Sequence, residues 1–418
     1  MTNPWKALKN IPHNMWVLFA ATLINRSGTM VLPFFGLYLI QRLHISEGDA
    51  GFILASYGLG ALITAPFVGK LSDYMGAMKV MKLSLLLTGG VMFIYPVFDG
   101  YNVLLLVTII FAVISEAFRP ANLAMIIEIV TPEQRKIAFA LNRLGINLGM
   151  SIGPVAGGFL MMFDYSIIFY VNGVFCILAA LFLIFSRWDK IPEEDIVLPE
   201  EPALSDGKRK TESFIKSIPL VKDKTLLFFV IIVLPLFMIF FQHLGTVPLF
   251  IVDYLGYTTA TFGLLMAINT VMITFIEVPL NDAMSHWSDR KSLLLGAVLT
   301  GVGFGAMAFV HGITGLVITI IIWTFGEMIV FPSSANYVAE IAPRDKRGVY
   351  MGFYQMTFSM AFTIGPLLGT QVYEHYGPVV LWLSAFALSL VSIVLLIKLP
   401  EKKIAASHTN PLRGKEGV

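Results

Sequence analysis

The stretch Gly69-Lys-Leu-Ser-Asp73-Tyr-Met-Gly76-Ala-Met-Lys79 is a polar loop between two long apolar blocks, at residues 48–69 and 80–97. Glycines permit a tight turn and a close approach of helices. An aspartate at this place can face the positive N-terminus of another helix. The sequence therefore predicts a short polar connection at one surface of a membrane, between two helices that cross it.

The two flanking blocks belong to a series of twelve. Of the 418 residues, 56% are hydrophobic and only 13% are charged, whereas a soluble domain carries about 25% charged residues. A helix crosses the hydrocarbon core with about 20 apolar residues, and it satisfies its own backbone there. We therefore expect an all-α integral membrane protein. Its predicted spans are 14–41, 48–69, 80–97, 102–130, 137–162, 165–186, 225–253, 258–281, 293–311, 314–341, 348–373 and 376–399.

The basic residues indicate the orientation. If the N-terminus is cytoplasmic, all but four of the 29 lysines and arginines fall in cytoplasmic segments; Arg42 lies outside, and Arg26, Arg119 and Arg143 lie within spans. Because basic residues mark cytoplasmic loops, we expect a multi-pass protein of the plasma (inner) membrane with both termini in the cytoplasm. No basic stripe stands free of the membrane segments, so nucleic acid is not an expected partner.

The spans divide into two similar halves. Residues 1–186 are expected to form one six-helix bundle, residues 187–224 a cytoplasmic linker, and residues 225–418 a second bundle with a short cytoplasmic tail. Several residues recur at an offset of 212 positions. The matched pairs are Pro120 and Pro332, Glu128 and Glu340, Arg135 and Arg347, Gly153-Pro154 and Gly365-Pro366, and Gly157 and Gly369. Such a parallel repeat predicts a binding site between the bundles, near the middle of the membrane.

The loop at residues 69–79 resembles the signature loop of the major facilitator superfamily, with Gly69, Asp73, Gly76 and Lys79 at the pattern positions. The resemblance covers nearly the whole chain, and it implies two bundles that rock against each other to expose a central site alternately to the two sides. The equivalent loop of the second half, residues 286–291, lacks the glycines.

The fifth span carries a second motif of that superfamily. Small residues at regular spacing let helices pack backbone to backbone, and a proline permits a kink. The residues are Gly149, Gly153, Pro154, Gly157 and Gly158. Their pattern is similar to one associated with drug–proton antiporters, although a plain packing face is the alternative. The fourth span departs from those antiporters, because its arginine, Arg119, lies deeper in the helix than theirs.

Charged side chains inside the spans are the main functional signal. An ionisable group at the bilayer centre costs at least about 2.5–3.5 kcal/mol. In the family fold, spans one, four, seven and ten line the cavity. The polar mid-span residues fall on these four spans: Arg26, Glu116, Arg119, Gln242, His243 and Glu327. We therefore assign Arg26, Glu116, Arg119, His243 and Glu327 to the substrate and proton cavity.

Several of these assignments have structural alternatives. Glu116 and Arg119 share a helix face and can form a self-contained pair. Arg26 needs a carboxylate from another helix, either Glu116 or Glu327. We expect Glu327 to be the proton-coupling carboxylate and Arg26 to tune it. His243 is either a proton carrier or a structural histidine.

The remaining charges lie nearer the cytoplasmic ends of the spans. Glu277, in the eighth span, is either a second proton site or a gate contact. Arg143, in the fifth, can simply extend its head group toward the surface. The matched pairs Glu128 with Arg135 and Glu340 with Arg347 are assigned to the inner gate, together with the loop at residues 69–79.

Together these features predict a proton-coupled exporter of amphiphilic or drug-like small molecules. One alternative is a proton-coupled transporter of one defined metabolite, such as a peptide, siderophore or sugar derivative. Another is a sensor or lipid-handling protein on the same scaffold. We expect a monomer and no enzymatic activity, cofactor or metal, because no nucleophile elbow, phosphate loop or metal-ligand cluster occurs; the single cysteine, Cys176, lies in an apolar block.

Overall fold

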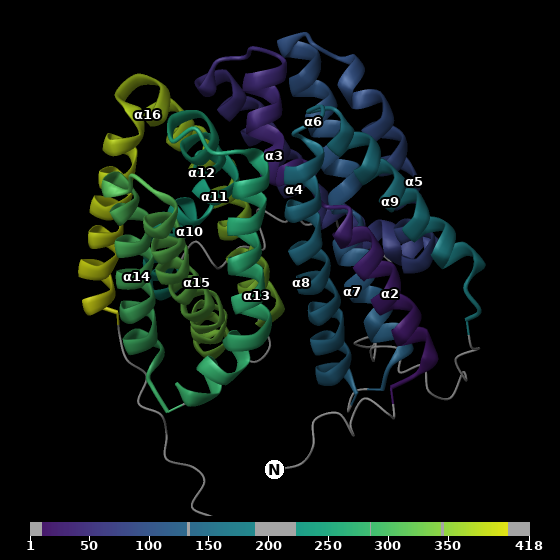
Figure 1. Ribbon diagram of the computed structural model, residues 1–418. Coiled ribbons are helices and arrows are strands. Elements are labelled where there is room, and N and C mark those ends of the chain that lie inside the picture. The colour runs from purple at the N-terminus through teal and green to yellow at the C-terminus, as the bar shows by residue number, and fades with distance from the viewer. Residues whose placement is uncertain (1–10, 132–133, 189–222, 285, 344–346, 400–418) are drawn as a thin grey trace, which may run out of the picture.

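The computed structural model describes residues 11–131, 134–188, 223–284, 286–343 and 347–399 (Figure 1). Within these ranges, it does not describe the side chains at 65–67, 69–70, 72–73, 135–136 and 347–349. The described residues form helices and connections and contain no strand. Of the expected linker, 187–224, the residues 189–222 lie outside the described part of the chain.

The first bundle contains the six predicted spans, three of them broken or extended by short helices. Its elements are α2 (His13–Ser27), α3 (Val31–Leu37) and the π-helix η1 (Tyr38–Arg42); α4 (Glu47–Met75); α5 (Ala77–Ile94) with the 3-10 helix η2 (Tyr95–Val97); α6 (Tyr101–Glu116) and α7 (Phe118–Ile129); α8 (Arg135–Leu160); and α9 (Ile167–Phe185).

The second bundle repeats this order. Its elements are α10 (Lys224–Phe240), α11 (Gln242–Gly245), α12 (Val247–Leu249) and the π-helix η5 (Phe250–Tyr254); α13 (Thr259–Ala283); α14 (Asp289–Gly305) with the 3-10 helix η6 (Ala306–Phe309); α15 (Ile313–Ile341); and α16 (Arg347–Ile397). Element α16 is bent at Gly377, whose φ of 81° is non-helical.

The described helices account for all twelve predicted spans. Nine helical stretches in the described residues are long and apolar enough to cross a membrane, and one of them, Tyr350–Ile397, contains the bend at Gly377. Dividing that stretch at the bend and adding α4 and α8, of 29 and 26 residues, gives twelve. The chain is therefore a multi-pass, all-α membrane protein.

The predicted loop at residues 69–79 is shorter than expected. Helix α4 continues through Asp73 to Met75, and α5 begins at Ala77. The turn is confined to Gly76, whose φ of 87° suits a residue without a side chain. The prediction of a loop from residue 69 was wrong, because polar residues beyond the apolar block do not by themselves end a helix.

The two bundles show the same repeat in their contacts. The π-helices η1 and η5 begin at Tyr38 and Phe250, 212 positions apart. Helix α4 packs on α16, and α13 packs on α8 in the same way. A Cβ on Gly51 would lie 3.4 Å from the Cα of Leu367, and one on Gly263 would lie 3.2 Å from the Cα of Val155. Gly263 lies 212 positions after Gly51, and Val155 lies 212 positions before Leu367, so the two contacts are equivalent in the repeat.

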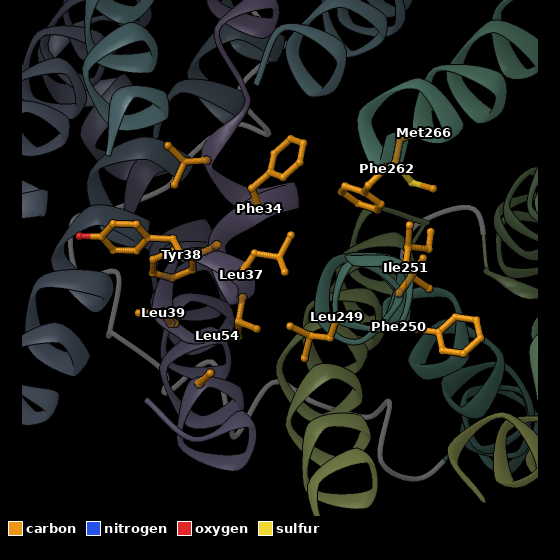
Figure 2. Close-up of a cluster of buried hydrophobic side chains, with 14 of the residues drawn as sticks. Phe34, Leu37, Tyr38, Leu39, Leu54, Leu249, Phe250, Ile251, Phe262 and Met266 are labelled. Carbon is orange, nitrogen blue, oxygen red and sulfur yellow. The ribbon is translucent and has the colours of Figure 1, made fainter. Parts of the chain in front are cut away.

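Three hydrophobic clusters show how the bundles meet. We call the end where α9 stops and α10 starts the linker end, and the end that holds η1 and η5 the far end. At the far end one cluster crosses between the bundles, joining Phe34 and Leu37 to Leu249 and Phe262 (Figure 2). Toward the linker end each bundle has its own cluster, drawn from residues 11–188 in one and 226–399 in the other. The hydrophobic contact between the bundles is thus at the far end, whereas toward the linker end each described cluster stays within one bundle.

Candidate substrate cavity and carboxylate sites

A cavity of about 320 Å³ lies between the bundles. The first bundle lines it with Leu32, Tyr57, Ala61, Glu116, Arg119, Pro120 and Leu123. The second bundle lines it with Phe241, Gln355, Phe358, Ser359 and Phe362. One wall is therefore aromatic and uncharged, and the opposite wall carries a carboxylate and a guanidinium.

A smaller recess of about 60 Å³ adjoins this cavity inside the first bundle. The recess and the cavity share Leu32, Tyr57 and Glu116. Among the other residues of the recess are Arg26, from α2, and Thr88, from α5. The structure thus brings Arg26 and Glu116 to one space, and Glu116 was one of the two carboxylates expected to serve that arginine.

Glu116 is held by a neutral donor. The hydroxyl of Tyr57 donates to Oε1 of Glu116 at 2.8 Å, and it lies 3.3 Å from the hydroxyl of Ser115. Among the described residues, no basic nitrogen lies within 4.0 Å of the Glu116 carboxylate. The alternative of a self-contained pair with Arg119 is therefore not realised in this conformation, although Arg119 lines the same cavity.

Glu327 is held in a similar way in the second bundle. The amide of Asn269 donates to Oε2 of Glu327 at 2.7 Å and to the hydroxyl of Thr324 at 3.1 Å. The two donors, Tyr57 and Asn269, are 212 positions apart in the sequence. The two carboxylates, Glu116 and Glu327, are 211 positions apart, one fewer than the repeat offset. The repeat therefore places a carboxylate beside a neutral donor once in each bundle.

His243 has structural partners. Its Nδ1 lies 2.7 Å from the carbonyl oxygen of Phe240, and its ring stacks on Trp323 at a centroid distance of 6.3 Å. Neither His243 nor Glu327 lines the cavity or the recess described above. Arg26 lines the recess and Glu327 does not, so these two spaces do not bring Glu327 to Arg26 in this conformation.

Glu277 forms an ion pair with Arg143 across the two bundles. Glu277 comes from α13 and is 9% exposed, and Arg143 comes from α8 and is 60% exposed. The expectation that Arg143 simply reaches toward the surface was incomplete, because a carboxylate of the other bundle lies within its reach. Both roles expected of Glu277, a second proton site and a gate contact, stay predictions.

Helix breaks place the charged groups of the first bundle. Helix α2 ends at Ser27, so Arg26 lies in its last turn, where the helix dipole favours a cation. Helix α6 ends at Glu116 and α7 starts two residues later. Each resumed helix, α3 and α7, carries a proline in its first turn, Pro33 and Pro120, where no backbone N–H is needed.

The glycine motif of α8 lies at two crossings. A Cβ on Gly153 would lie 2.6 Å from the carbonyl oxygen of Thr29, and Gly149 and Gly157 approach the same span of the first bundle. Gly158 faces the other way, toward the second bundle, and its carbonyl accepts a hydrogen bond of 2.7 Å from Thr259. Pro154 approaches Gly263 of the second bundle. The motif therefore packs α8 against both its own bundle and α13.

The residues assigned to the inner gate are only partly described. The structure describes the backbone of Gly69, Asp73, Arg135 and Arg347 but not the side chains or surroundings of these residues. Lys79 is exposed at the start of α5. The amide of Asn336 donates to Glu340 at 3.2 Å and to Asp289 at 3.0 Å, and Glu128 lies at the end of α7.

Sequence reasoning missed several partners in these sites. It did not identify Asn269 or Gln355. The offset of 212 could have found Asn269, because it is the repeat equivalent of Tyr57. Nothing in the sequence paired Arg143 with Glu277, since their repeat equivalents, Gln355 and Ala65, carry no charge.

A cavity between two six-helix repeats, closed at one end of the molecule, defines a membrane transporter that alternates between two openings. The family comparison agrees. The family model of the major facilitator superfamily matches residues 17–281 and 244–416, and the chain belongs to that superfamily. It is a transporter of small molecules and not an enzyme.

The chain is similar to members of several subfamilies. It is 24% identical to Multidrug resistance protein 2 of Bacillus subtilis, over 91% of this chain and 92% of the relative. It is 23% identical to the quinolone resistance protein NorA of Staphylococcus aureus, over 88% of this chain and 91% of the relative. Among solved structures, the nucleoside transporter NupG matches with a TM-score of 0.76 at 14% identity, over 94% of this chain and 100% of NupG. This last likeness shows the fold alone.

Proposed function

We propose that this protein is a proton-coupled exporter of amphiphilic or drug-like molecules. The observation that carries the proposal is the pair of carboxylates, Glu116 and Glu327, each held by a neutral hydroxyl or amide near the centre of its bundle. Among the described residues neither carboxylate has a basic nitrogen within 4.0 Å, so protonation of the carboxylate breaks no ion pair. The names of the two resistance-protein relatives support export of drug-like compounds.

The aromatic wall of the cavity supports an amphiphilic substrate. Phe241, Phe358 and Phe362 offer apolar surface to a hydrophobic body, and Glu116 and Arg119 face them across about 320 Å³ of space. Pockets of this kind fix orientation with few polar groups and gain affinity from apolar burial. One proton that crosses a potential of 100 mV supplies about 2.3 kcal/mol for the cycle.

We further propose that the protein is a monomer in the plasma membrane. Its linker end then faces the cytoplasm. The conformation described here is then inward-facing. Eight lysines and arginines at residues 187–224 motivate this orientation. A cysteine placed at Ser205 in a Cys176→Ala background should escape an impermeant thiol reagent in intact cells, and modification from outside would contradict the orientation.

The second candidate function is transport of one defined zwitterionic metabolite. The presence of both Glu116 and Arg119 in the cavity favours it, because each charge can bind one end of a zwitterion.

Proton flux in proteoliposomes tests the proposed function. Vesicles that contain the purified chain and the pH dye pyranine receive outward gradients of a quinolone, ethidium and 4-(1-pyrenyl)butyrate in turn. At least two of the three should drive protons inward, and a protonophore should abolish the signal. Proton movement with only one probe would favour the dedicated carrier. No movement with any probe, from protein that melts cooperatively, would contradict the proposal.

A further inference from the structure

The cavity and its recess together hold more positive than negative charge. Arg26 and Arg119 contribute two guanidinium groups, and Glu116 contributes the only carboxylate among the described residues that line either space. The second bundle lines the cavity with neutral side chains. Glu116 is therefore the single counter-charge for two guanidinium groups, of which Arg119 is exposed.

Arg26 has spare hydrogen-bonding capacity. Its Nε is buried and has no hydrogen-bond partner in the described structure, and among the described residues no carboxylate oxygen lies within 4.0 Å of its guanidinium. Glu116, the nearest candidate, already accepts from Tyr57. A buried donor without a partner is costly, so the recess contains a donor that an acceptor group on a ligand could satisfy.

Thr88 adds a second, independent donor in the same recess. Its side chain is 5% exposed, and its hydroxyl oxygen is buried without a partner. The recess of about 60 Å³ also has enough room for a small acidic group. A cavity measured in this way needs only about 10–15 Å³ to hold one water molecule.

We propose that the preferred substrates are amphiphiles that carry an acidic group, a carboxylate or sulfonate. The acid enters the recess and accepts from Arg26 and Thr88, and the apolar body lies in the cavity against Phe241 and Phe358. Arg119, which lines the cavity, adds attraction for the acid. A guanidinium binds a carboxylate with two parallel hydrogen bonds, which gives the site preference for acids over esters and amines. This inference rests on the proposed function and names its substrate class.

An equilibrium binding experiment on the full chain tests the inference without any proton gradient. The probes are 4-(1-pyrenyl)butyrate, its methyl ester and 1-pyrenebutylamine, titrated into protein in phosphatidylcholine nanodiscs while melting temperature and Kd are followed. The acid should bind the wild-type chain at least tenfold more tightly than the ester or the amine, and it should raise the melting temperature by mass action. An amine or ester that binds as tightly as the acid, or no binding by any of the three, overturns the proposal.

Variants at Arg26 test whether the acidic group of the probe binds in the recess. Arg26→Gln should weaken binding of the acid at least tenfold and leave the ester within twofold. The matched control is Arg42→Gln, an exposed arginine in the same span at the far end, which should change no probe. If Arg26→Gln does not fold, Arg26→Lys replaces it and should weaken the acid severalfold, because it keeps the charge and loses the planar fork. A change below twofold in the acid Kd of the folded variant overturns the proposal.

An anionic lipid offers the same chemistry from another source. In nanodiscs with phosphatidylglycerol, the lipid should compete weakly or not at all with the acid. If phosphatidylglycerol raises the melting temperature in an Arg26-dependent way and the acid does not, the recess is a lipid site and the proposal is wrong. Failure of proton coupling would instead appear in the proteoliposome flux, with the acid preference intact.

Discussion

At the scale of single residues, the chain treats its intramembrane carboxylates in two ways. Glu116 and Glu327 accept hydrogen bonds from neutral groups, whereas Glu277 forms an ion pair with Arg143. Removing one member of a buried ion pair leaves the other charge uncompensated, at a cost of about 3–5 kcal/mol when both groups are buried. Neutral partners avoid that cost on protonation. The residue types alone could not separate these cases, because the partners come from helices far away in sequence.

The assignment of Glu327 predicts the behaviour of Glu327→Gln. Glutamine keeps the shape and still accepts from Asn269, but it does not titrate. Proton-driven transport should be lost, and substrate affinity should stay within about tenfold, or 1.4 kcal/mol. Melting temperature, Kd and proton flux are measured on the same preparation. Glu277→Gln is the comparison, since it weakens an inter-bundle ion pair. Normal proton-driven transport by folded Glu327→Gln would shift the proton site to Glu116.

At the scale of elements, sequence predicted the helices better than their breaks and crossings. The apolar blocks give the first span as 14–41 and the seventh as 225–253, close to the observed 13–42 and 224–254. The breaks at residues 28–30 and at Ala117 were not predicted. The hydrophobic pattern of the helix continues across a break of one to three residues, so the hydropathy of the sequence does not reveal the break.

The crossing of α8 and α13 predicts that Gly263 tolerates no side chain. A Cβ there would lie 3.1 Å from the carbonyl carbon of Pro154, so Gly263→Val should overpack the crossing and destabilise the protein by roughly 1–3 kcal/mol. Gly90→Val is the matched control, because Gly90 lies inside α5 with no atom within 4 Å of an added Cβ. Thermal melting should show a lower melting temperature for Gly263→Val alone. Equal melting temperatures would mean that the crossing is looser than it is in this conformation.

At the scale of the whole molecule, the sequence predicted the two bundles and the repeat, but not which end is closed. The two states of such a transporter share almost all contacts within each bundle and differ only in those between bundles. The far-end cluster that joins Phe34 to Phe262, and the bond between Gln41 and Asp253, belong to one state. A sequence encodes both states, so neither can be read from it alone.

The far-end contact predicts how the balance of states can be moved. Gln41 and Asp253 are 212 positions apart, so they are equivalent residues that meet where the repeat axis passes between the bundles, and the amide of Gln41 donates to the carboxylate of Asp253. Gln41→Ala removes this bond, together with the hydrogen bond that Gln41 accepts from the hydroxyl of Tyr165 within the first bundle. The bond is partly exposed, so its loss should cost about 1 kcal/mol and shift the ratio of states roughly fivefold toward opening at the far end.

Spin-label distances measure this shift. Labels at Asp99 and His311 span the far end, and labels at Tyr74 and Asp282 span the linker end, all at exposed positions in a Cys176→Ala background. In Gln41→Ala the far-end distances should lengthen as the linker-end distances shorten, because the bundles rock as rigid bodies about α8 and α13. Asn102→Ala removes an exposed amide at the same end and should leave both distributions unchanged. Far-end distances that lengthen without a change at the linker end would show local loosening in place of a rocking motion.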